Sequence, residues 1–212
     1  MNKKIPIPSI ERLCSMYHLV EQLEEDGLRS ISSVEIGRQL GVNANSVRKD
    51  INYLGEIGNC RAGYSLKKLK ENLIKTLQIN RIRSTCIVGL GRLGTAILEY
   101  DRLSKSGFGI VAGFDSNINK IETIQTSVPL YPANEISTIV KREKIELAML
   151  AVPAHAAAES AKRLIEGGIL GIVNFSIAVI KPEKGVCVRN IDLVGELRIV
   201  SVLSMLSKEN IF

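Results

Sequence analysis

The apolar positions near the start of the chain predict a helix. Apolar side chains repeat at helical spacing from Ile10 to Leu23, and Gly27 follows where such a helix would end. Ser9 precedes the repeat and is a suitable N-cap, because its hydroxyl can accept a hydrogen bond from the first turn. We therefore expect a first helix over roughly residues 9–26.

Two shorter helices with a tight turn between them are predicted next. Ser32 and Glu35 have the spacing of a capping box, which opens a helix that ends at Gly41. Asn43 can cap a third helix. The apolar stripe of this third helix comprises Val47, Ile51 and Leu54. Two short helices joined by a glycine turn form a helix-turn-helix.

A glycine-rich segment follows the predicted helix-turn-helix. Three glycines interrupt residues 55–64, which favours a hairpin, or wing, over more helix. Leucines at helical spacing then predict a helix over residues 66–77, and residues 80–84 form a polar connector.

Beyond the connector, apolar runs of strand length alternate with stretches of helical periodicity. The strand-like runs cover residues 85–88, 110–114, 147–152, 171–175 and, more weakly, 185–188. The helical stretches cover residues 92–105, 133–143 and 154–166. This alternation predicts a parallel sheet with helices on both faces.

A last amphipathic helix is predicted from residue 192 to about residue 206. Its apolar side carries Leu193, Leu197, Val200, Leu203 and Leu206. No later segment is available for this side to cover, so we expect it to pack on a second subunit.

A glycine motif follows the first strand of the second half. Gly89 permits a tight turn, Gly91 lets the backbone approach a pyrophosphate, and Gly94 allows close packing of helix on strand. Asp115 ends the next strand, where a carboxylate accepts hydrogen bonds from ribose hydroxyls and repels a 2′-phosphate. This favours NAD(H) over NADP(H). The alternative for Asp115 is an ordinary turn aspartate.

Two later strands end in residues that would share the ligand edge of the sheet. These are Val152-Pro153 and Asn174-Phe175, although either pair could be a simple turn. The fold class is therefore α/β, with a winged helix-turn-helix domain (1–80), a Rossmann-like parallel-sheet domain (84–191) and a C-terminal dimerisation helix (192–212).

Positive charge is concentrated in one third of the chain. The net charge is +6, and residues 29–83 alone carry eleven Lys or Arg against four acidic residues, or +7. Such a segment suits a polyanionic partner, although a merely well-solvated basic face is the plainer interpretation.

The face of the third helix opposite its apolar stripe is polar and basic. It carries Asn45, Ser46, Arg48, Lys49, Asn52 and Tyr53. Arg and Lys can bind guanine edges or phosphates, and the other side chains can bond to the DNA backbone. Arg61 on the predicted wing is positioned to enter a minor groove.

Other function classes find little support in the sequence. No 18-residue apolar run or export signal is present, so we expect no membrane association. The four cysteines and two histidines lack metal-ligand spacing and indicate reduced thiols in the cytoplasm. Tyr64 and Lys68 have a dehydrogenase-like spacing but precede the glycine motif, and His155 is more simply a loop histidine. We therefore do not expect an enzyme.

A set of motifs follows in a fixed order along nearly the whole chain. These motifs are Val47-Arg48-Lys49-Asp50, Gly55-Glu56-x-Gly58, Gly63-Tyr64, Gly89-x-Gly91-Arg92-Leu93-Gly94, Phe114-Asp115, Val152-Pro153, Gly171-Ile172-Val173-Asn174-Phe175 and Asn190-x-Asp192. In this order and spacing they resemble the Rex family of bacterial redox-sensing transcriptional repressors.

The resemblance implies a homodimer with swapped final helices that binds a palindromic operator and is released by NADH. Arg48, Lys49, Gly63 and Tyr64 would belong to the DNA-binding surface. The residues that would bind NAD(H) are Gly89, Gly91, Arg92, Leu93, Gly94, Asp115, Val152, Pro153, Asn174 and Phe175.

Four positions match residues of an intersubunit contact that changes with redox state or lie beside it. Tyr100 and Asp192 match that contact, and His18 stands where many members have an arginine that pairs with the acid. Leu193 stands where some members place a phenylalanine against the nicotinamide. The wing and the last ligand loop also depart from the family, with Cys60-Arg61 and Ser176-Ile177.

The function expected from these features is redox-sensing repression: the operator is released when NADH binds. Two rivals remain. The first is an NAD-dependent dehydrogenase with an N-terminal interaction domain. The second is a DNA-binding regulator whose ligand is coenzyme A or ATP.

Overall fold

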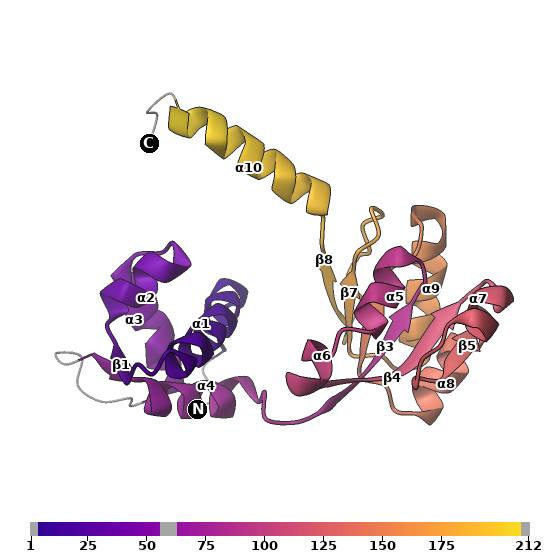
Figure 1. Cartoon of the computed structure of the whole chain (residues 1–212), viewed down its shortest axis with the longest axis horizontal. Coiled ribbons are helices and arrows are strands. Elements are labelled where there is room, and N and C mark those ends of the chain that lie inside the picture. The colour runs from indigo at the N-terminus through magenta and orange to yellow at the C-terminus, as the bar shows by residue number, and fades with distance from the viewer. Residues whose placement is uncertain (1–3, 56–62, 209–212) are drawn as a thin grey trace. The chain divides into compact units, whose positions relative to one another are not determined.

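The computed structural model describes residues 4–55 and 63–208 of the chain (Figure 1). The chain divides into two compact units, residues 1–81 and residues 82–212. Within the described ranges, no helix combines the length and the apolar character that crossing a membrane requires.

The N-terminal unit is mostly helical. Its elements are α1 (Ile7–Glu25), β1 (Ser30–Ile31), α2 (Ser33–Leu40), α3 (Ala44–Ile51), a 3₁₀ turn (Asn52–Leu54), β2 (Tyr64–Ser65) and α4 (Leu66–Leu77). β1 and β2 pair antiparallel, with Ile31 opposite Tyr64. The apolar sides of α1, α3 and α4 meet in one core, which includes Leu13, Met16, Val47, Ile51, Leu69 and Leu73.

The helix-turn-helix has the caps that the sequence predicts. The Ser32 hydroxyl accepts from the Glu35 N–H, and the Glu35 carboxylate accepts from the Ser32 N–H, so the capping box is confirmed. Gly41 ends α2 with a φ of +67°, and the Asn43 side chain accepts from the Ser46 N–H.

The predicted start of the first helix is wrong. α1 begins at Ile7, with Pro6 as its N-cap, and Ser9 is a buried residue inside the helix. Pro8 occupies the first turn, where the missing N–H costs no hydrogen bond, so the helix extends past the serine. The Ser9 hydroxyl instead accepts from Arg12.

A partly buried ion pair joins α1 to α3. The Arg12 guanidinium donates from Nε to Asp50 Oδ2 at 2.6 Å and from Nη2 to Asp50 Oδ1 at 2.9 Å. The Asp50 side chain is 1% exposed, whereas Arg12 is 29% exposed. This bidentate pair fixes the rotation of α3 against α1, and thereby which side of α3 faces solvent.

Replacing Arg12 by methionine leaves the Asp50 carboxylate buried without its partner. We expect Arg12→Met to lower the free energy of unfolding of the N-terminal unit by about 3 kcal/mol, the lower end of the range for breaking a buried pair. Urea denaturation followed by circular dichroism measures this change. The control is Arg38→Met at an exposed position of α2; an equal loss in both variants would show that the ion pair contributes nothing.

The C-terminal unit is built on a parallel sheet with the strand order β5-β4-β3-β6-β7-β8. Its strands are β3 (Arg83–Val88), β4 (Phe108–Asp115), β5 (Leu130–Pro132), β6 (Leu147–Leu150), β7 (Gly171–Asn174) and β8 (Cys187–Asn190). Its helices are α5 (Arg92–Leu98), α6 (Arg102–Lys105), α7 (Ile118–Thr123), α8 (Ile136–Arg142), α9 (Ala154–Glu166) and α10 (Leu193–Lys208), and a 3₁₀ turn (Ala133–Glu135) precedes α8.

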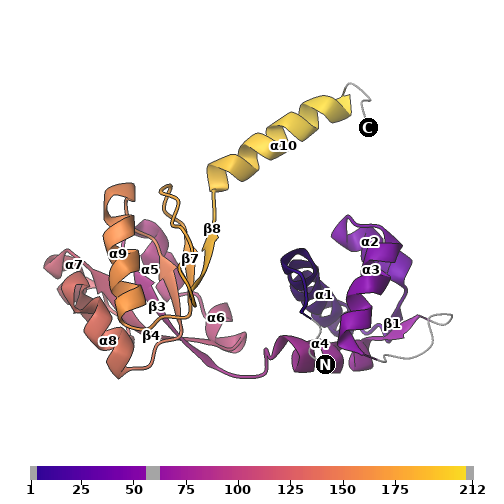
Figure 2. The ribbon, with the colours of Figure 1, turned by 180° about the vertical axis from the view of Figure 1, so that it is seen from behind.

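Helices cover both faces of this sheet, as predicted. Alternate residues of β3 point to opposite sides. Cys86 and Val88 join the core that includes residues of α8 and α9, whereas Ile87 packs with Leu98 of α5. Figures 1 and 2 show α5 and α9 on opposite sides of the sheet.

Several predicted bounds in this unit are corrected by the structure. The helix expected over 92–105 is two helices, α5 and α6, with Tyr100 between them. The strand expected over 147–152 ends at Leu150, because Pro153 precedes α9. β5 and α7 were not predicted, since three and six residues are too short to establish a period.

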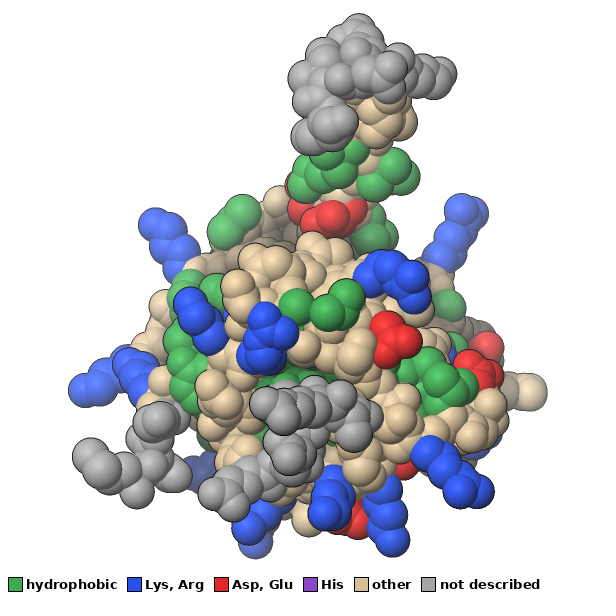
Figure 3. Space-filling view, turned by 90° about the vertical axis from the view of Figure 1, so that its left-hand side faces the viewer, with side chains coloured by type: hydrophobic (Ala, Val, Ile, Leu, Met, Phe, Trp, Pro, Cys, Tyr) green, Lys and Arg blue, Asp and Glu red, His purple; other side chains and the backbone are tan. Residues whose placement is uncertain are grey.

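α10 carries apolar side chains that the rest of the chain leaves exposed. Asp192 caps the helix, with its Oδ1 accepting from the N–H groups of Val194 and Gly195. The large apolar residues that are exposed include Leu193, Leu197, Ile199, Val200, Val202, Leu203 and Met205. Some of these hydrophobic side chains are visible in Figure 3.

Candidate functional sites

The three glycines of the motif lie in different surroundings. Gly89 has a φ of +95°, and an added Cβ would lie 2.5 Å from the Ala151 carbonyl oxygen. An added Cβ at Gly94 would lie 1.8 Å from the Gly89 carbonyl oxygen. At Gly91 it would meet nothing within 4 Å. Gly89 and Gly94 are therefore required by packing, whereas Gly91 leaves open space beside the backbone.

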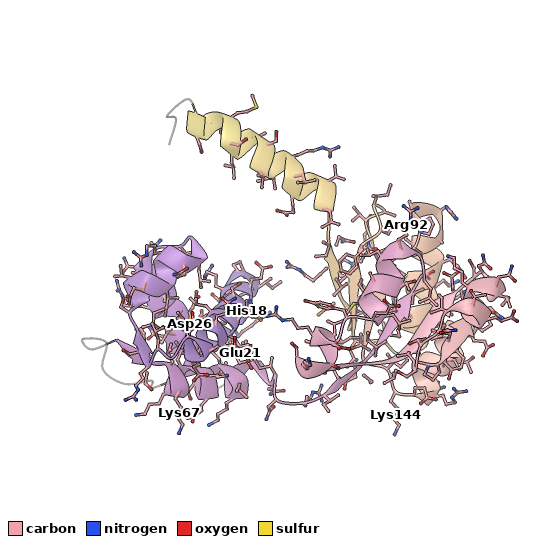
Figure 4. All side chains as sticks on the ribbon, in the orientation of Figure 1. His18, Glu21, Asp26, Lys67, Arg92 and Lys144 are labelled. Carbon is pink, nitrogen blue, oxygen red and sulfur yellow. The ribbon has the colours of Figure 1, made fainter. Side chains whose placement is uncertain are left out.

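The loop leads into α5, whose N-cap is Gly91. The first N–H groups of a helix have no partner within the helix and lie at the positive end of its dipole, which suits a phosphate. Arg92 and Leu93 in this turn are exposed. Figure 4 labels Arg92 at this end of the sheet.

Asp115 is bound to the glycine loop. Its Oδ2 accepts from the Leu90 N–H at 2.7 Å and from the Lys120 ammonium at 3.2 Å, and its Oδ1 accepts from the Asn117 N–H at 2.8 Å. Burial alone raises the pKa of this carboxyl group, but the hydrogen bonds from Asn117, Leu90 and Lys120 outweigh it and lower the pKa below its usual range. Asp115 is therefore a carboxylate at neutral pH.

Lys120 is a site residue that sequence reasoning missed. It lies on α7, which was not predicted, and its ion pair with Asp115 places a cation beside the predicted ribose acid. Its position five residues after the acid was the only available signal.

The predicted ligand residues of four strands share one edge of the sheet. Backbone hydrogen bonds connect the carboxyl ends of strands that are neighbours in the sheet. They run from Gly89 N to Phe114 O, from Ala151 N to Val88 O, from Phe175 N to Leu150 O and from Ile191 N to Asn174 O. Val152 and Pro153 follow β6 at this edge, so the structure brings the glycine loop, Val152-Pro153 and Asn174-Phe175 together.

The Asn174 side chain is engaged within the protein. It is fully buried, its Oδ1 accepts from the Ser176 N–H, and its Nδ2 donates to the Ala178 carbonyl and to Asn190 Oδ1. Asn190 was not predicted as a site residue, because its distance from Asn174 in the sequence gives no sign of the contact.

The DNA-binding residues predicted for the third helix lie mostly on the solvent side; α3 ends at Ile51, so Asn52 and Tyr53 lie in the 3₁₀ turn that follows. Asn45, Arg48, Lys49 and Asn52 are exposed, and Ser46 and Tyr53 are half-buried. The Arg48 guanidinium donates to the Ser33 hydroxyl at 3.0 Å and to Asn45 Oδ1. Arg48 is thereby oriented from the start of α2. Figure 3, which faces this unit, shows more Lys and Arg side chains than acidic ones.

The predicted wing residues divide into three cases. Arg61 lies outside the described residues. Gly63 has a φ of +82°, and an added Cβ would lie 3.1 Å from the Ile31 carbonyl oxygen. Tyr64 is 4% exposed and packs in the core of the N-terminal unit, so the structure gives its ring a packing role.

The residues predicted at or beside the redox-dependent intersubunit contact come from both units. His18 is exposed on α1, where Figure 4 labels it close to Glu21. Tyr100 and Leu193 are exposed in the C-terminal unit, and Asp192 caps α10. Among the described residues, no cluster of three or more His, Cys, Asp or Glu side chains is arranged to hold a metal ion.

The candidates for catalysis are dispersed. Tyr64 is buried in the N-terminal unit, whereas Lys68 is exposed on α4, and neither belongs to the unit with the glycine loop. His155 is exposed at the start of α9.

A helix-turn-helix unit and a parallel-sheet unit with a glycine loop together define a class of ligand-responsive DNA-binding regulators. Residues 4–52 match the family model "Putative DNA-binding protein N-terminus", and residues 80–178 match "CoA binding domain". The redox-sensing transcriptional repressor Rex of Carboxydothermus hydrogenoformans is 34% identical over 93% of this chain and 95% of its own length. Rex 1 of Thermotoga maritima is 35% identical over 95% of this chain and 96% of its own length. The chain belongs to the Rex family.

Solved structures of a Rex-family repressor called RSP are also similar. RSP in complex with beta-NADH has a TM-score of 0.88 at 30% identity and covers 99% of this chain and 98% of its own. RSP in complex with beta-NAD+ and operator DNA has a TM-score of 0.87 at 30% identity, covering 99% of this chain and 96% of its own.

The surroundings of Gly94 and Gly91 predict different effects on stability for the same substitution, glycine to alanine. Gly94→Ala places a methyl group against the Gly89 carbonyl, so we expect a loss of about 1–3 kcal/mol in the stability of the C-terminal unit. Gly91→Ala meets open space at a φ of −79° and should leave that stability unchanged. Urea unfolding of both variants measures this, and equal stabilities would contradict the packing role of Gly94.

Proposed function

We propose that this chain is an NADH-responsive transcriptional repressor that binds a palindromic operator as a homodimer. The observation that carries the proposal is the similarity to Rex repressors over more than nine tenths of the chain, with both units present. The RSP complexes with beta-NADH and with beta-NAD+ and operator DNA support NADH, NAD+ and operator DNA as ligands here.

The geometry of the sheet edge supports the dinucleotide. Open space at Gly91 permits a pyrophosphate to approach the backbone at the start of α5. Asp115 Oδ1 uses one of its two acceptor positions for Asn117, so the other is available for a ribose hydroxyl. The ionised carboxylate disfavours a 2′-phosphate, and Lys120 moderates that repulsion.

The exposed side of α3 supports DNA binding. Arg48 and Lys49 project from a helix whose rotation is fixed by the Arg12–Asp50 pair, and the surrounding segment carries the excess positive charge of the chain. Two such helices related by a twofold axis read two half-sites of a palindrome.

α10 supports the homodimer. A helix with exposed apolar residues on its surface is stabilised when a second subunit covers them, and the resemblance to Rex assigns this role to the swapped final helix. The relatives are named as repressors, which argues against an enzyme, and a repressor of this kind acts on the chromosome in the cytoplasm.

One alternative ligand has specific support. The family model that matches residues 80–178 is described as a CoA binding domain, so coenzyme A is the second candidate for the sheet edge. Displacement of NADH by coenzyme A at equal concentration would favour it.

Removing the Lys49 ammonium tests the DNA surface. We expect Lys49→Ala to weaken operator binding about tenfold, because a phosphate or guanine contact is lost, and to reduce the salt dependence of binding. Fluorescence anisotropy with a labelled Rex-type palindrome at several salt concentrations measures both effects. Lys162→Ala, an exposed lysine on α9, is the control; identical affinities in the two variants would exclude a DNA contact by Lys49.

Neutralising Asp115 tests the coenzyme preference. We expect Asp115→Asn to reduce the ratio of NADH to NADPH affinity by roughly tenfold, because the repulsion of a 2′-phosphate disappears while Lys120 remains. Isothermal titration calorimetry measures both affinities. Glu122→Gln on α7 removes a nearby exposed acid and should leave the ratio unchanged. An unchanged ratio in Asp115→Asn would assign Asp115 to the turn alone.

A further inference from the structure

Two asparagines at the ends of neighbouring strands hold one loop of the C-terminal unit. Asn174 ends β7 and Asn190 ends β8, and the two residues are paired in the sheet register. The Asn174 Nδ2 donates to Asn190 Oδ1 at 2.8 Å. Together they bind the backbone of residues 176–180, which we call the clamped loop.

The hydrogen bonds of this pair are reciprocal. Asn174 accepts from the Ser176 N–H at 3.0 Å and donates to the Ala178 carbonyl at 2.7 Å. Asn190 accepts from the Ile180 N–H at 3.0 Å and donates to the Ile180 carbonyl at 3.0 Å. Each amide both accepts from a backbone N–H and donates to a backbone carbonyl of the loop, so an apolar or carboxylate side chain in its place would lose at least one of these bonds.

The clamp has a different functional element on each side. On one side, the clamped loop follows Phe175, whose N–H is bound to Leu150 at the edge shared with the glycine loop. Ile177 and Val179 in the loop are 85% and 76% exposed. On the other side, the chain continues from Asn190 through one residue to Asp192, the cap of α10.

We propose that the Asn174–Asn190 clamp transmits the position of the clamped loop to the start of α10, and that Asn190 is thereby a positioning residue of the NADH response. This inference rests on the proposed function. A ligand shifts an equilibrium only through contacts that differ between two states, and those contacts must reach the element that changes. Ile177 and Val179 offer apolar surface for a bound dinucleotide to cover, and the clamp makes the loop and the end of β8 move as one.

The alternative is a purely structural role for the two amides. In that case their loss would weaken every activity of the protein in proportion. A positioning role instead affects the linkage between ligand and DNA, which is the ratio of operator affinities without and with NADH.

The test compares the wild type with Asn190→Ala, Asn190→Asp and the control Cys187→Ala. Cys187 is exposed at the opposite end of β8. Calorimetry gives the NADH affinity, and anisotropy gives the operator affinity without and with saturating NADH. A wild-type ratio in the usual allosteric range is about 5- to 150-fold.

For Asn190→Ala we expect that ratio to fall to within about twofold of one, while NADH affinity and ligand-free operator affinity each stay within about threefold of wild type. Asn190→Asp keeps the two accepted bonds but not the donated one, so its ratio should be intermediate. For Cys187→Ala we expect the same ratio of operator affinities as for the wild type.

Two outcomes overturn the clamp inference while the proposed function stands. In one, NADH lowers the operator affinity of the wild type and of Asn190→Ala by the same factor. In the other, Asn190→Ala loses operator affinity equally with and without NADH, which is the structural role. A wild type that shows no NADH effect refutes the proposed function instead, and the clamp inference with it.

Hydrogen exchange on the wild-type chain provides a measurement that does not need a folded variant. NADH should change the protection of the amides of residues 176–180 and of residues 193–196 together, because the clamp links them. A change confined to the clamped loop overturns the inference.

Discussion

The glycine loop keeps its shape because Asp115 holds it from the neighbouring strand. The Leu90 N–H donates to the carboxylate, and the adjacent Gly89 N–H donates to the Phe114 carbonyl, so β4 binds two consecutive residues of the loop. The carbonyl of Gly89 then lies against Gly94, with no space for a side chain between them. The loop before α5, where the phosphate site is proposed, is therefore held by the end of β4, and the Asp115 carboxylate supplies one of these two bonds.

The N-terminal unit uses a buried aspartate in a similar way. Asp50 directly follows Arg48 and Lys49, and its bidentate pair with Arg12 anchors the inner side of the helix whose outer side is proposed to read DNA. A buried ion pair is weak evidence for high stability, because desolvation offsets much of the attraction. Its value here is orientation, since the two hydrogen bonds of the pair hold α3 in the observed rotation against α1.

The sequence predicted the features that depend on neighbouring residues. The caps at Ser32, Gly41 and Asn43 were correct because a cap is a contact within four residues. The parallel sheet with helices on both faces was predicted from the alternation of strand-length apolar runs with stretches of helical periodicity. The partnership of Asn174 with Asn190 was not predictable, because it depends on the register of β7 against β8. Tyr64 was placed on the DNA surface because the motif shows residue type but not burial.

Because the apolar surface of α10 is proposed to hold the dimer together, operator binding depends on the concentration of the protein. The dimer presents two N-terminal units, each with its own α3, to the two half-sites of the operator. Dilution below the dimer dissociation constant separates these units, and operator affinity then falls steeply as the protein concentration decreases. The cell could therefore adjust repression through the abundance of the chain as well as through its coenzyme, and the same nicotinamide ratio would produce different outputs at low and high expression.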